Sequence, residues 1–312
     1  MRHAPLPIGK LLAIVADLQA AGEYERGYRR SRDLLASMDG TPPDECTACR
    51  ILIAAARSAY YVSRFDECAE LLDRCGGLLA RVSETERREV SIRAALIRAD
   101  MLRRIGRYRE ALDLLEECSG DSIETETERL LIAGACHYYL KNLDEADGAL
   151  ETALGLATHL HDDRLRSRVL SMTGLAAQAR GLLRSAEEYL SRAMELCHAR
   201  SDAYGEASAG LNLGIALYKS GRFEEAAASI ERARTIFKAI GWHIGECRAL
   251  LARGNVEKYR RNVVEGKRHL EKALRIAETG GFVREQALAH EFLGEIETMR
   301  ERFDAALARY RK

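Results

Sequence analysis

The sequence predicts an all-α fold, a right-handed superhelical solenoid of about eight helix-turn-helix repeats. The first observation is a glycine that recurs every 40 residues, at Gly134, Gly174, Gly214, Gly254 and Gly294. The second is that small residues follow at fixed distances, twelve and nineteen positions after the glycine. The third is that all four prolines lie before residue 44, so no proline interrupts a helix in the rest of the chain. A fixed period of this length is typical of repeat architectures.

The first helix of each repeat carries the recurring glycine, which we number position 8. We expect the second helix to pass close to this position, because a larger side chain would clash there. A turn is expected near position 15, where Gly181 and Gly221 supply a residue suited to it.

The second helix of each repeat carries apolar or small residues at positions 17, 20, 24 and 27. In one repeat these are Phe223, Ala226, Ile230 and Ala233. Spacings of three, four and three place them on one helix face, which we expect to pack against the first helix. The small residues allow close approach of the two helices, and the large ones fill the space between layers.

These positions resemble the tetratricopeptide repeat (TPR), which has a small residue at 8, a large one at 17, Ala at 20, a bulky one at 24 and Ala at 27. The usual TPR period is 34 residues, and a proline closes the second helix. Here the period is 40 and that proline is absent, so the second helix is longer by about a turn and a half. The longer repeat is similar to those of large bacterial regulators and of some eukaryotic scaffold proteins. Turns between repeats are expected near Asp162, Ser201, Gly241 and Gly280.

The whole chain, residues 1–312, is predicted to form a single TPR solenoid. Its repeats are expected roughly at 8–43, 49–85, 92–126, 127–166, 167–206, 207–246, 247–286 and 287–312. The last is truncated, because Lys312 falls at position 26, before the final small residue. Since a terminal repeat needs a polar cap, our hypothesis is that the chain is a fragment that continues into further repeats or an effector domain.

Composition gives no sign of a nucleic-acid or membrane protein. Lys plus Arg and Asp plus Glu both number 48, so no overall charge attracts a polyanion. No apolar stretch has the length of a membrane span, and the first residues do not form a convincing signal peptide. We expect a cytoplasmic protein that does not contact membranes.

Eight cysteines are expected to be buried free thiols in a reducing compartment. Cys68 takes the place of the small residue at position 20, and Cys75 and Cys118 take that of position 27. Cys46 and Cys49 form a CxxC pair, but no second pair or nearby histidine completes a zinc site.

No catalytic motif is present, and we predict that the chain is not an enzyme and uses no cofactor or metal. There is no glycine-rich phosphate loop between a strand and a helix. His159 and His161 flank a turn that contains Asp162 and Asp163. We interpret these four residues as ordinary surface residues.

The TPR resemblance implies that the first helices line an inner wall where partners bind, with positions 2, 5, 9, 12 and 13 facing the groove. The corresponding residues are Arg50, Arg57, Tyr60, Tyr61, Arg93, Arg103, Tyr138, Tyr139, Arg168, Gln178, Tyr218, Lys219, Arg248, Asn255, Lys258 and Tyr259. Acidic residues share these positions, among them Asp100, Glu128, Glu291 and Glu295. Because Arg and Tyr commonly anchor interfaces, the set predicts a groove for an extended or helical peptide of acidic character. The alternative is that these are solvated helix faces whose tyrosines pack between repeats.

One known TPR site is not expected. Repeats that hold the C-terminal carboxylate of heat-shock chaperones use Lys at position 5 and Asn at position 9. No repeat of this chain has Lys at position 5.

The leading prediction is therefore a non-catalytic module that binds a protein or peptide. It would serve as the sensory or scaffolding region of a larger bacterial transcriptional regulator. One alternative is a nucleic-acid-associated solenoid that uses the basic residues of the inner wall, although no clustered basic face is evident. The other is a self-association module, a homo-oligomer formed by stacking through the uncapped C-terminal repeat.

Overall fold

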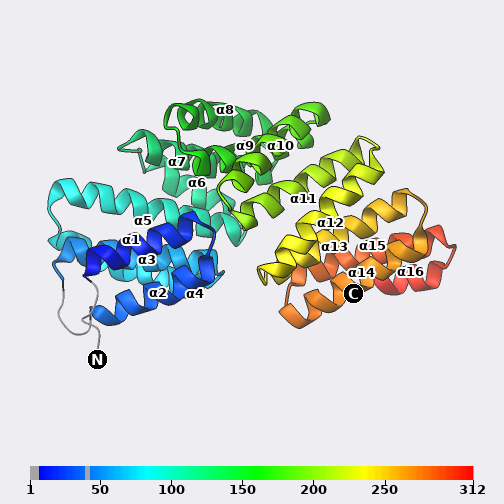
Figure 1. Cartoon of the computed structure of the whole chain (residues 1–312), viewed down its shortest axis with the longest axis horizontal. Helices are drawn as coiled ribbons and strands as arrows, with labels where there is room; N and C mark the ends of the chain where they lie inside the picture. The colour runs from blue at the N-terminus through cyan, green and yellow to red at the C-terminus, as the bar shows by residue number, and fades with distance from the viewer. Residues whose placement is uncertain (1–6, 39–42, 312) are drawn as a thin grey trace. The chain divides into compact units, whose positions relative to one another are not determined.

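The structure, a computed structural model, describes residues 7–38 and 43–311. These residues form sixteen α-helices and one short 3-10 helix, and no strand occurs among them (Figure 1). The predicted all-α class and the helix-turn-helix repeat are confirmed.

The chain divides into two compact units, Met1–Ala176 and Ala177–Lys312, which we call the N-terminal and the C-terminal unit. The N-terminal unit contains α1 (Ile8–Ala20), α2 (Tyr24–Ser37), α3 (Glu45–Tyr61), α4 (Phe65–Leu78), η1 (Leu79–Arg81), α5 (Glu84–Arg104), α6 (Tyr108–Glu116), α7 (Ile123–Leu140) and α8 (Leu143–His159). Helix α9 (Asp163–Ala179) begins in this unit and ends in the next. The C-terminal unit contains α10 (Leu183–Ala199), α11 (Ala203–Lys219), α12 (Phe223–Ala239), α13 (His243–Tyr259), α14 (Val263–Gly280), α15 (Val283–Met299) and α16 (Phe303–Tyr310). That all repeats form one domain stays a prediction.

Within each unit the two helices of a repeat pack together, as α7 does with α8 and α13 with α14. The first helices of successive repeats also contact one another. In the N-terminal unit α3 contacts α5 and α5 contacts α7, and in the C-terminal unit α11 contacts α13 and α13 contacts α15. Side chains on the first helices are thus brought near those of the neighbouring repeats.

The turn inside each repeat is made by one residue in the left-handed conformation. It falls at position 15 in all eight repeats, at Gly22, Ser63, Gly106, Lys141, Gly181, Gly221, Arg261 and Glu301. A second residue of this kind, at position 35, forms the turn to the next repeat at His161, Ser201, Gly241 and Gly281. The predicted turns are confirmed, and they limit each helix to its repeat.

The recurring glycine stands where the two helices of a repeat touch. A Cβ atom on Gly134 would lie 2.7 Å from Leu150 Cγ, and one on Gly214 would lie 2.5 Å from Ile230 Cγ1. Gly254 and Gly294 face the corresponding residues of their own repeats at 2.6 Å. In all four repeats the residue that would be struck is at position 24. The expected close approach is confirmed at these four glycines.

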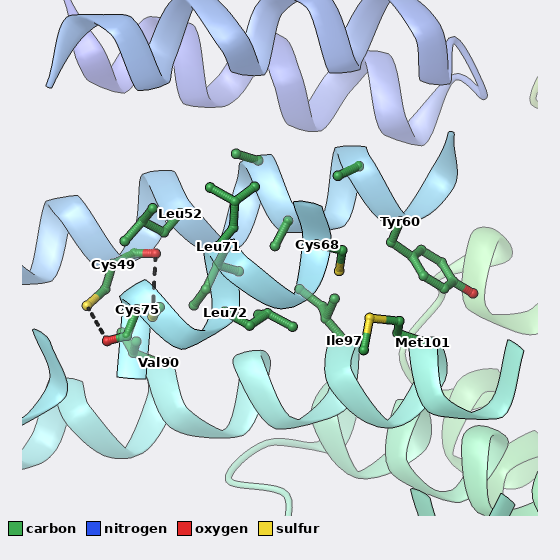
Figure 2. Packing of buried hydrophobic residues seen from close by; sticks show 14 of the residues in the cluster. Cys49, Leu52, Tyr60, Cys68, Leu71, Leu72, Cys75, Val90, Ile97 and Met101 are labelled. Atoms are coloured by element: carbon green, nitrogen blue, oxygen red, sulfur yellow. Dashed lines mark hydrogen bonds between the residues drawn. The ribbon is translucent and has the colours of Figure 1, made fainter. Parts of the chain in front are cut away.

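One buried hydrophobic cluster of the N-terminal unit lies between α3, α4 and α5 (Figure 2). Cys49 of α3 faces Cys75 of α4, and each thiol donates a hydrogen bond to the other's carbonyl oxygen at 3.8 and 4.0 Å. Burial raises the pKa of the Cys75 thiol to about 12. All eight cysteines of the chain are buried and none forms a disulfide, so the predicted buried thiols are confirmed.

Candidate functional site

Charged and aromatic residues from α3, α5, α7 and α9 come together in the N-terminal unit. We call this group the inner cluster; its members are Arg57, Tyr60, Asp100, Arg103, Glu128 and Arg168. All of them except Arg103 line one small cavity of about 20 Å³. That volume holds roughly one water molecule, so the residues of the cluster already fill most of the space between their helices.

Asp100 is the first of two buried acidic residues in the inner cluster. Its carboxylate accepts hydrogen bonds from the Tyr60 hydroxyl at 2.6 Å and from Arg103 Nε at 2.7 Å. Arg168 Nη2 lies 3.6 Å away. Burial acts to raise the pKa of Asp100, but these two arginines and the tyrosine outweigh it and hold that pKa at about 2. Asp100 is therefore ionised at neutral pH.

Glu128 is the second buried acidic residue. Its carboxylate lies 3.3 Å from Arg168 Nη1, 3.6 Å from Arg164 Nη2 and 3.7 Å from Arg57 Nη2. Burial acts to raise the pKa of Glu128, and the three arginines bring it below the ordinary value. Arg168 contacts both acidic residues, so it links the two halves of the inner cluster.

Positive groups outnumber negative ones around the inner cluster. Arg104 adds a fifth arginine, with Nε 3.2 Å from the Tyr60 hydroxyl and its guanidinium over the Tyr60 ring. Arg164 also approaches Glu124 and Asp162, at 3.8 and 3.6 Å. Even with these two carboxylates counted, five arginines face four acidic groups. The balance favours an acidic ligand over a basic one.

The C-terminal unit has a corresponding group on α11 and α13, which we call the C-terminal wall: Tyr218, Arg248, Asn255, Lys258 and Tyr259. Two of its cations pair with glutamates of α15. Arg248 Nε donates to Glu285 at 2.7 Å, and Lys258 Nζ donates to Glu295 at 2.5 Å. Lys258 also lies over the Tyr259 ring, 4.9 Å from its centre.

The polar middle of the C-terminal wall is only partly satisfied. Asn255 Nδ2 lies 3.5 Å from the Tyr218 hydroxyl, at the limit of a hydrogen bond, and Asn255 Oδ1 is buried with no donor. Burial is the main reason that the pKa of Tyr218 is raised. Asn255 is therefore a polar group that a ligand's N–H could satisfy.

Three of the predicted tyrosines stack on an aromatic residue of the preceding repeat. The pairs are Tyr61 with Tyr24 at 4.3 Å, Tyr139 with Tyr108 at 5.1 Å, and Tyr259 with Phe223 at 6.4 Å between ring centres. In each pair position 13 meets position 17. This packing supports the alternative interpretation for these three residues, which hold neighbouring repeats together.

The other predicted residues lie outside both groups. Arg50 and Arg93 share the carboxylate of Glu89, at 3.6 and 3.3 Å. Tyr138 packs edge-on against Tyr139, Lys219 is exposed, and Gln178 has a buried Oε1 with no hydrogen bond. The acidic Glu291 is also exposed.

No family model matches the chain, and no curated protein sequence matches it. Solved structures are similar to it. The Rap protein complexed with Competence and Sporulation Factor has a TM-score of 0.69 at 14% identity, with 97% of this chain and 96% of that chain covered. The STAND protein with a tetratricopeptide repeat sensor from Pyrococcus horikoshii has a TM-score of 0.65 at 16% identity, covering 98% and 47%. Aspartyl phosphate phosphatase F from Bacillus subtilis has a TM-score of 0.58 at 12% identity, covering 99% and 94%.

The fold is that of a TPR-like helical-repeat protein. At these identities the likeness establishes the fold alone. The chain matches nearly the full length of the Rap protein, and it spans about half of the STAND protein.

The TPR positions explain one of the two arginines that sequence reasoning missed. Arg104 occupies position 13 of its repeat, a position that faces the groove in this fold, so the signal was present. Arg164 lies at position 38, near the start of α9, where no groove rule applies. Its role depends on how α9 lies beside Glu128, and the sequence pattern does not specify that.

Within residues 7–38 and 43–311, no three His, Cys, Asp or Glu side chains are placed to hold a metal ion. Over the same ranges, no helix has the length and apolar character needed to cross a membrane.

Proposed function

We propose that the chain is a non-catalytic module that binds a protein or peptide along the faces of its first helices and prefers acidic segments. The observation that carries the proposal is the inner cluster, where arginines from successive first helices converge on Asp100 and Glu128. A guanidinium can hold a carboxylate through two parallel hydrogen bonds, so the same arginines suit acidic side chains of a ligand.

Access to the inner cluster is from its exposed side. The side chains of Arg57 and Arg168 are 22% and 34% exposed, whereas those of Asp100 and Glu128 are 9% and 10% exposed. A ligand carboxylate reaches the outer edges of the two arginines while the internal carboxylates stay in place. The 20 Å³ cavity admits no ligand group, so binding takes place over the surface of the cluster.

The biological role that we propose is the sensory or scaffolding region of a larger bacterial transcriptional regulator. Two similar structures support it by analogy of fold. One is the Rap protein complexed with Competence and Sporulation Factor, and the other is a STAND protein with a tetratricopeptide repeat sensor. The phosphatase among the similar structures shares the fold at 12% identity, and a shared fold does not transfer a reaction.

The test is fluorescence anisotropy with two labelled twelve-residue peptides that share their apolar residues, one rich in Glu and the other with Gln in those places. We expect the full chain to bind the Glu peptide more tightly. The double variant Arg57→Gln/Arg168→Gln should bind it at least about tenfold more weakly, because two charge-assisted contacts are lost. Arg74→Gln is the control, since Arg74 is an exposed arginine on α4 and should leave binding unchanged.

Circular dichroism of each variant checks that the helices remain folded. Equal binding of the Glu and Gln peptides, or undiminished binding by the double variant, would rule out the inner cluster as the binding surface. A mixed oligonucleotide that binds with a steep salt dependence would instead favour the nucleic-acid alternative.

The self-association alternative is favoured by one observation. Phe303, Leu307 and Tyr310 of α16 are 66%, 48% and 51% exposed, so this helix presents apolar surface that a second copy could cover. Light scattering over a range of protein concentrations tests it. A mass that rises with concentration in the wild type but not in Leu307→Glu would support stacking through α16, and a constant mass in both would exclude it.

A further inference from the structure

A second concavity lies in the C-terminal unit, and residues of α12, α13 and α14 line it. We call it the outer hollow. Its volume is about 740 Å³, which is within the range of small-molecule sites. Arg253 of α13 lines it and lies five residues from both Arg248 and Lys258, which is about 140° around the helix. The outer hollow is therefore on a different side of α13 from the C-terminal wall.

The outer hollow is positively charged in a chain that is neutral overall. Its cations are Arg234, Arg253, Arg260, Arg268, Lys272 and Arg275, and its carboxylates are Glu231, Glu257 and Glu265. Six positive groups against three lining carboxylates leave an excess of three, and an excess of one remains when Glu246 and Glu224, which pair with Arg234 and Arg260 at 3.4 and 3.2 Å, are also counted. Burial is the main reason that the pKa of His269, also in the lining, lies below its ordinary value. The imidazole is therefore neutral at neutral pH and does not change this balance.

Two of the cations of the outer hollow have no partner among the described residues. The carboxylates are held by Arg234, Arg268 and Arg260, at 2.5, 2.7 and 3.2 Å. Lys272 and Arg275 make no ion pair or side-chain hydrogen bond within the described residues.

A third cation, Arg253, lies in the floor of the outer hollow and is paired with a buried carboxylate. Arg253 Nη1 lies 2.6 Å from Glu257 Oε1, but this atom is buried and makes no aligned hydrogen bond. Glu257 is 2% exposed, and its Oε2 is buried without a donor as well. The floor thus holds a buried ion pair in which Arg253 Nη1 and Glu257 Oε2 make no aligned hydrogen bond.

The preceding repeat provides an internal comparison. A hollow of about 750 Å³ lined by α10, α11 and α12 has Leu213 and Leu217 at the places of Arg253 and Glu257. Its charged lining residues are Arg192 and Arg222 against Glu187, Glu188 and Glu225. The repeat therefore builds such a hollow with an apolar floor and a slight negative balance. Because charged groups are costly to bury, the fold alone does not account for Arg253 and Glu257.

We propose that the outer hollow binds a small ligand that carries two or more phosphate groups. Lys272, Arg275 and Arg253 supply the donors, and guanidinium groups match phosphate oxygens in pairs. A hydroxyl of the ligand or a bridging water donates to Glu257 Oε2. A long polyanion running along the repeats would meet Glu187, Glu188 and Glu225 in the neighbouring hollow, so the geometry favours a compact ligand.

The first experiment is isothermal titration calorimetry of the full chain with inorganic pyrophosphate and tripolyphosphate at constant ionic strength. We expect saturable binding with one site. Lys272→Gln/Arg275→Gln should weaken it at least tenfold, and these exposed residues can be changed without disturbing the core. The matched control is Arg192→Gln/Arg222→Gln, which removes both cations of the neighbouring hollow and should leave binding unchanged.

A second variant, Arg253→Leu/Glu257→Leu, gives the outer hollow the apolar floor that the hollow of the preceding repeat has. We expect it to lose pyrophosphate binding and to keep its thermal stability, because leucine fills both places in the neighbouring hollow. Absence of binding by the wild type, or equal loss in the control variant, would overturn the proposal. A mixed oligonucleotide or a phosphorylated peptide that binds more tightly and displaces pyrophosphate would show that the ligand is a macromolecule, which also overturns it.

Discussion

A methyl group on Gly134 would lie 2.7 Å from Leu150 Cγ and 3.3 Å from the Ala146 carbonyl oxygen. On the facing helix α8, a methyl group on Gly148 would have nothing within 4 Å. Both glycines lie inside helices of the same unit and differ in what surrounds them. Alanine at Gly148 therefore reports the intrinsic helix preference alone, whereas alanine at Gly134 also reports the packing between the two helices.

We expect Gly148→Ala to raise the free energy of unfolding by about 0.5 to 1 kcal/mol, because alanine favours helix where space is free. Gly134→Ala should lower it by about 1 to 2 kcal/mol, because overpacking outweighs that gain. Urea unfolding followed by circular dichroism measures both. Stabilisation by Gly134→Ala would show that the helices separate easily and that the recurring glycine does not set their distance.

The residues at position 15 of the repeats show which turns the glycine pattern predicts and which it does not. The turn at position 15 was indicated by Gly181 and Gly221, whose left-handed backbone suits glycine. Ser63, Lys141, Arg261 and Glu301 adopt the same conformation without any local signal. Only their place in the repeat predicts a turn at these four residues, because packing of the two helices fixes the backbone whichever residue is present.

At the scale of helices, the inner cluster is a closed path of charge contacts. Tyr60 of α3 donates to Asp100 of α5, and Arg168 of α9 contacts both Asp100 and Glu128 of α7. Arg57 of α3 contacts Glu128, and this contact closes the path. Four helices from four repeats are thus held together by two buried carboxylates.

Asp100 makes this arrangement sensitive to acid. Its pKa is about 2 in the folded chain and 3.8 in the absence of tertiary contacts. The stabilisation is therefore complete above the unfolded pKa and is lost as the pH falls from about 5 toward 2. At pH 7 we expect Asp100→Asn to be less stable than the wild type by about 2 kcal/mol. The difference should shrink as the pH approaches 2.

Urea unfolding at several pH values between 7 and 2 measures this difference. The control is Asp113→Asn, which removes an exposed carboxylate on α6 and should keep the wild-type dependence on pH. A gap between Asp100→Asn and the wild type that stays constant down to pH 2 would contradict an ionised, stabilising Asp100.

The sequence predicted the shared wall better than the contacts within it. The period placed Arg57, Tyr60 and Arg168 on one face of the stack, and the structure brings them together. Their pairing was not predictable, since consecutive first helices meet in more than one register. Tyr60 and Asp100 are 40 residues apart, whereas Lys258 and Glu295 are 37 apart, a difference of about one helical turn. The outer hollow was missed because its residues fall on positions that face no groove in the TPR pattern.

At the scale of the whole chain, the reactivity of the buried cysteines allows the opening of each compact unit to be measured separately. Six lie in the N-terminal unit, and Cys197 and Cys247 lie in the C-terminal unit; all are buried and none forms a disulfide. Burial raises the pKa of Cys68, Cys136 and Cys247 to about 12. Since the thiolate is the reactive form, these groups react only when the structure around them opens.

We expect an aromatic disulfide reagent at pH 8 to label the native chain on the order of 100-fold more slowly than the chain in urea. Mass spectrometry of peptides assigns the label to each cysteine and so to each unit. Ser119→Cys introduces an exposed thiol beside the buried Cys118 and should react at once, as a control for the reagent. Rapid labelling of any natural cysteine in the folded chain would contradict its burial.

If acidic partners bind at the inner cluster as proposed, they meet arginines that already hold carboxylates of their own chain. An acidic group of a partner then gains only the free energy of its own contact with an arginine minus that of the internal contact that it weakens. We therefore expect a single acidic group to bind weakly, and several groups on the same partner to be needed for tight binding. Under the proposed function, we therefore expect this surface to discriminate partners by the number of acidic groups that they present at once.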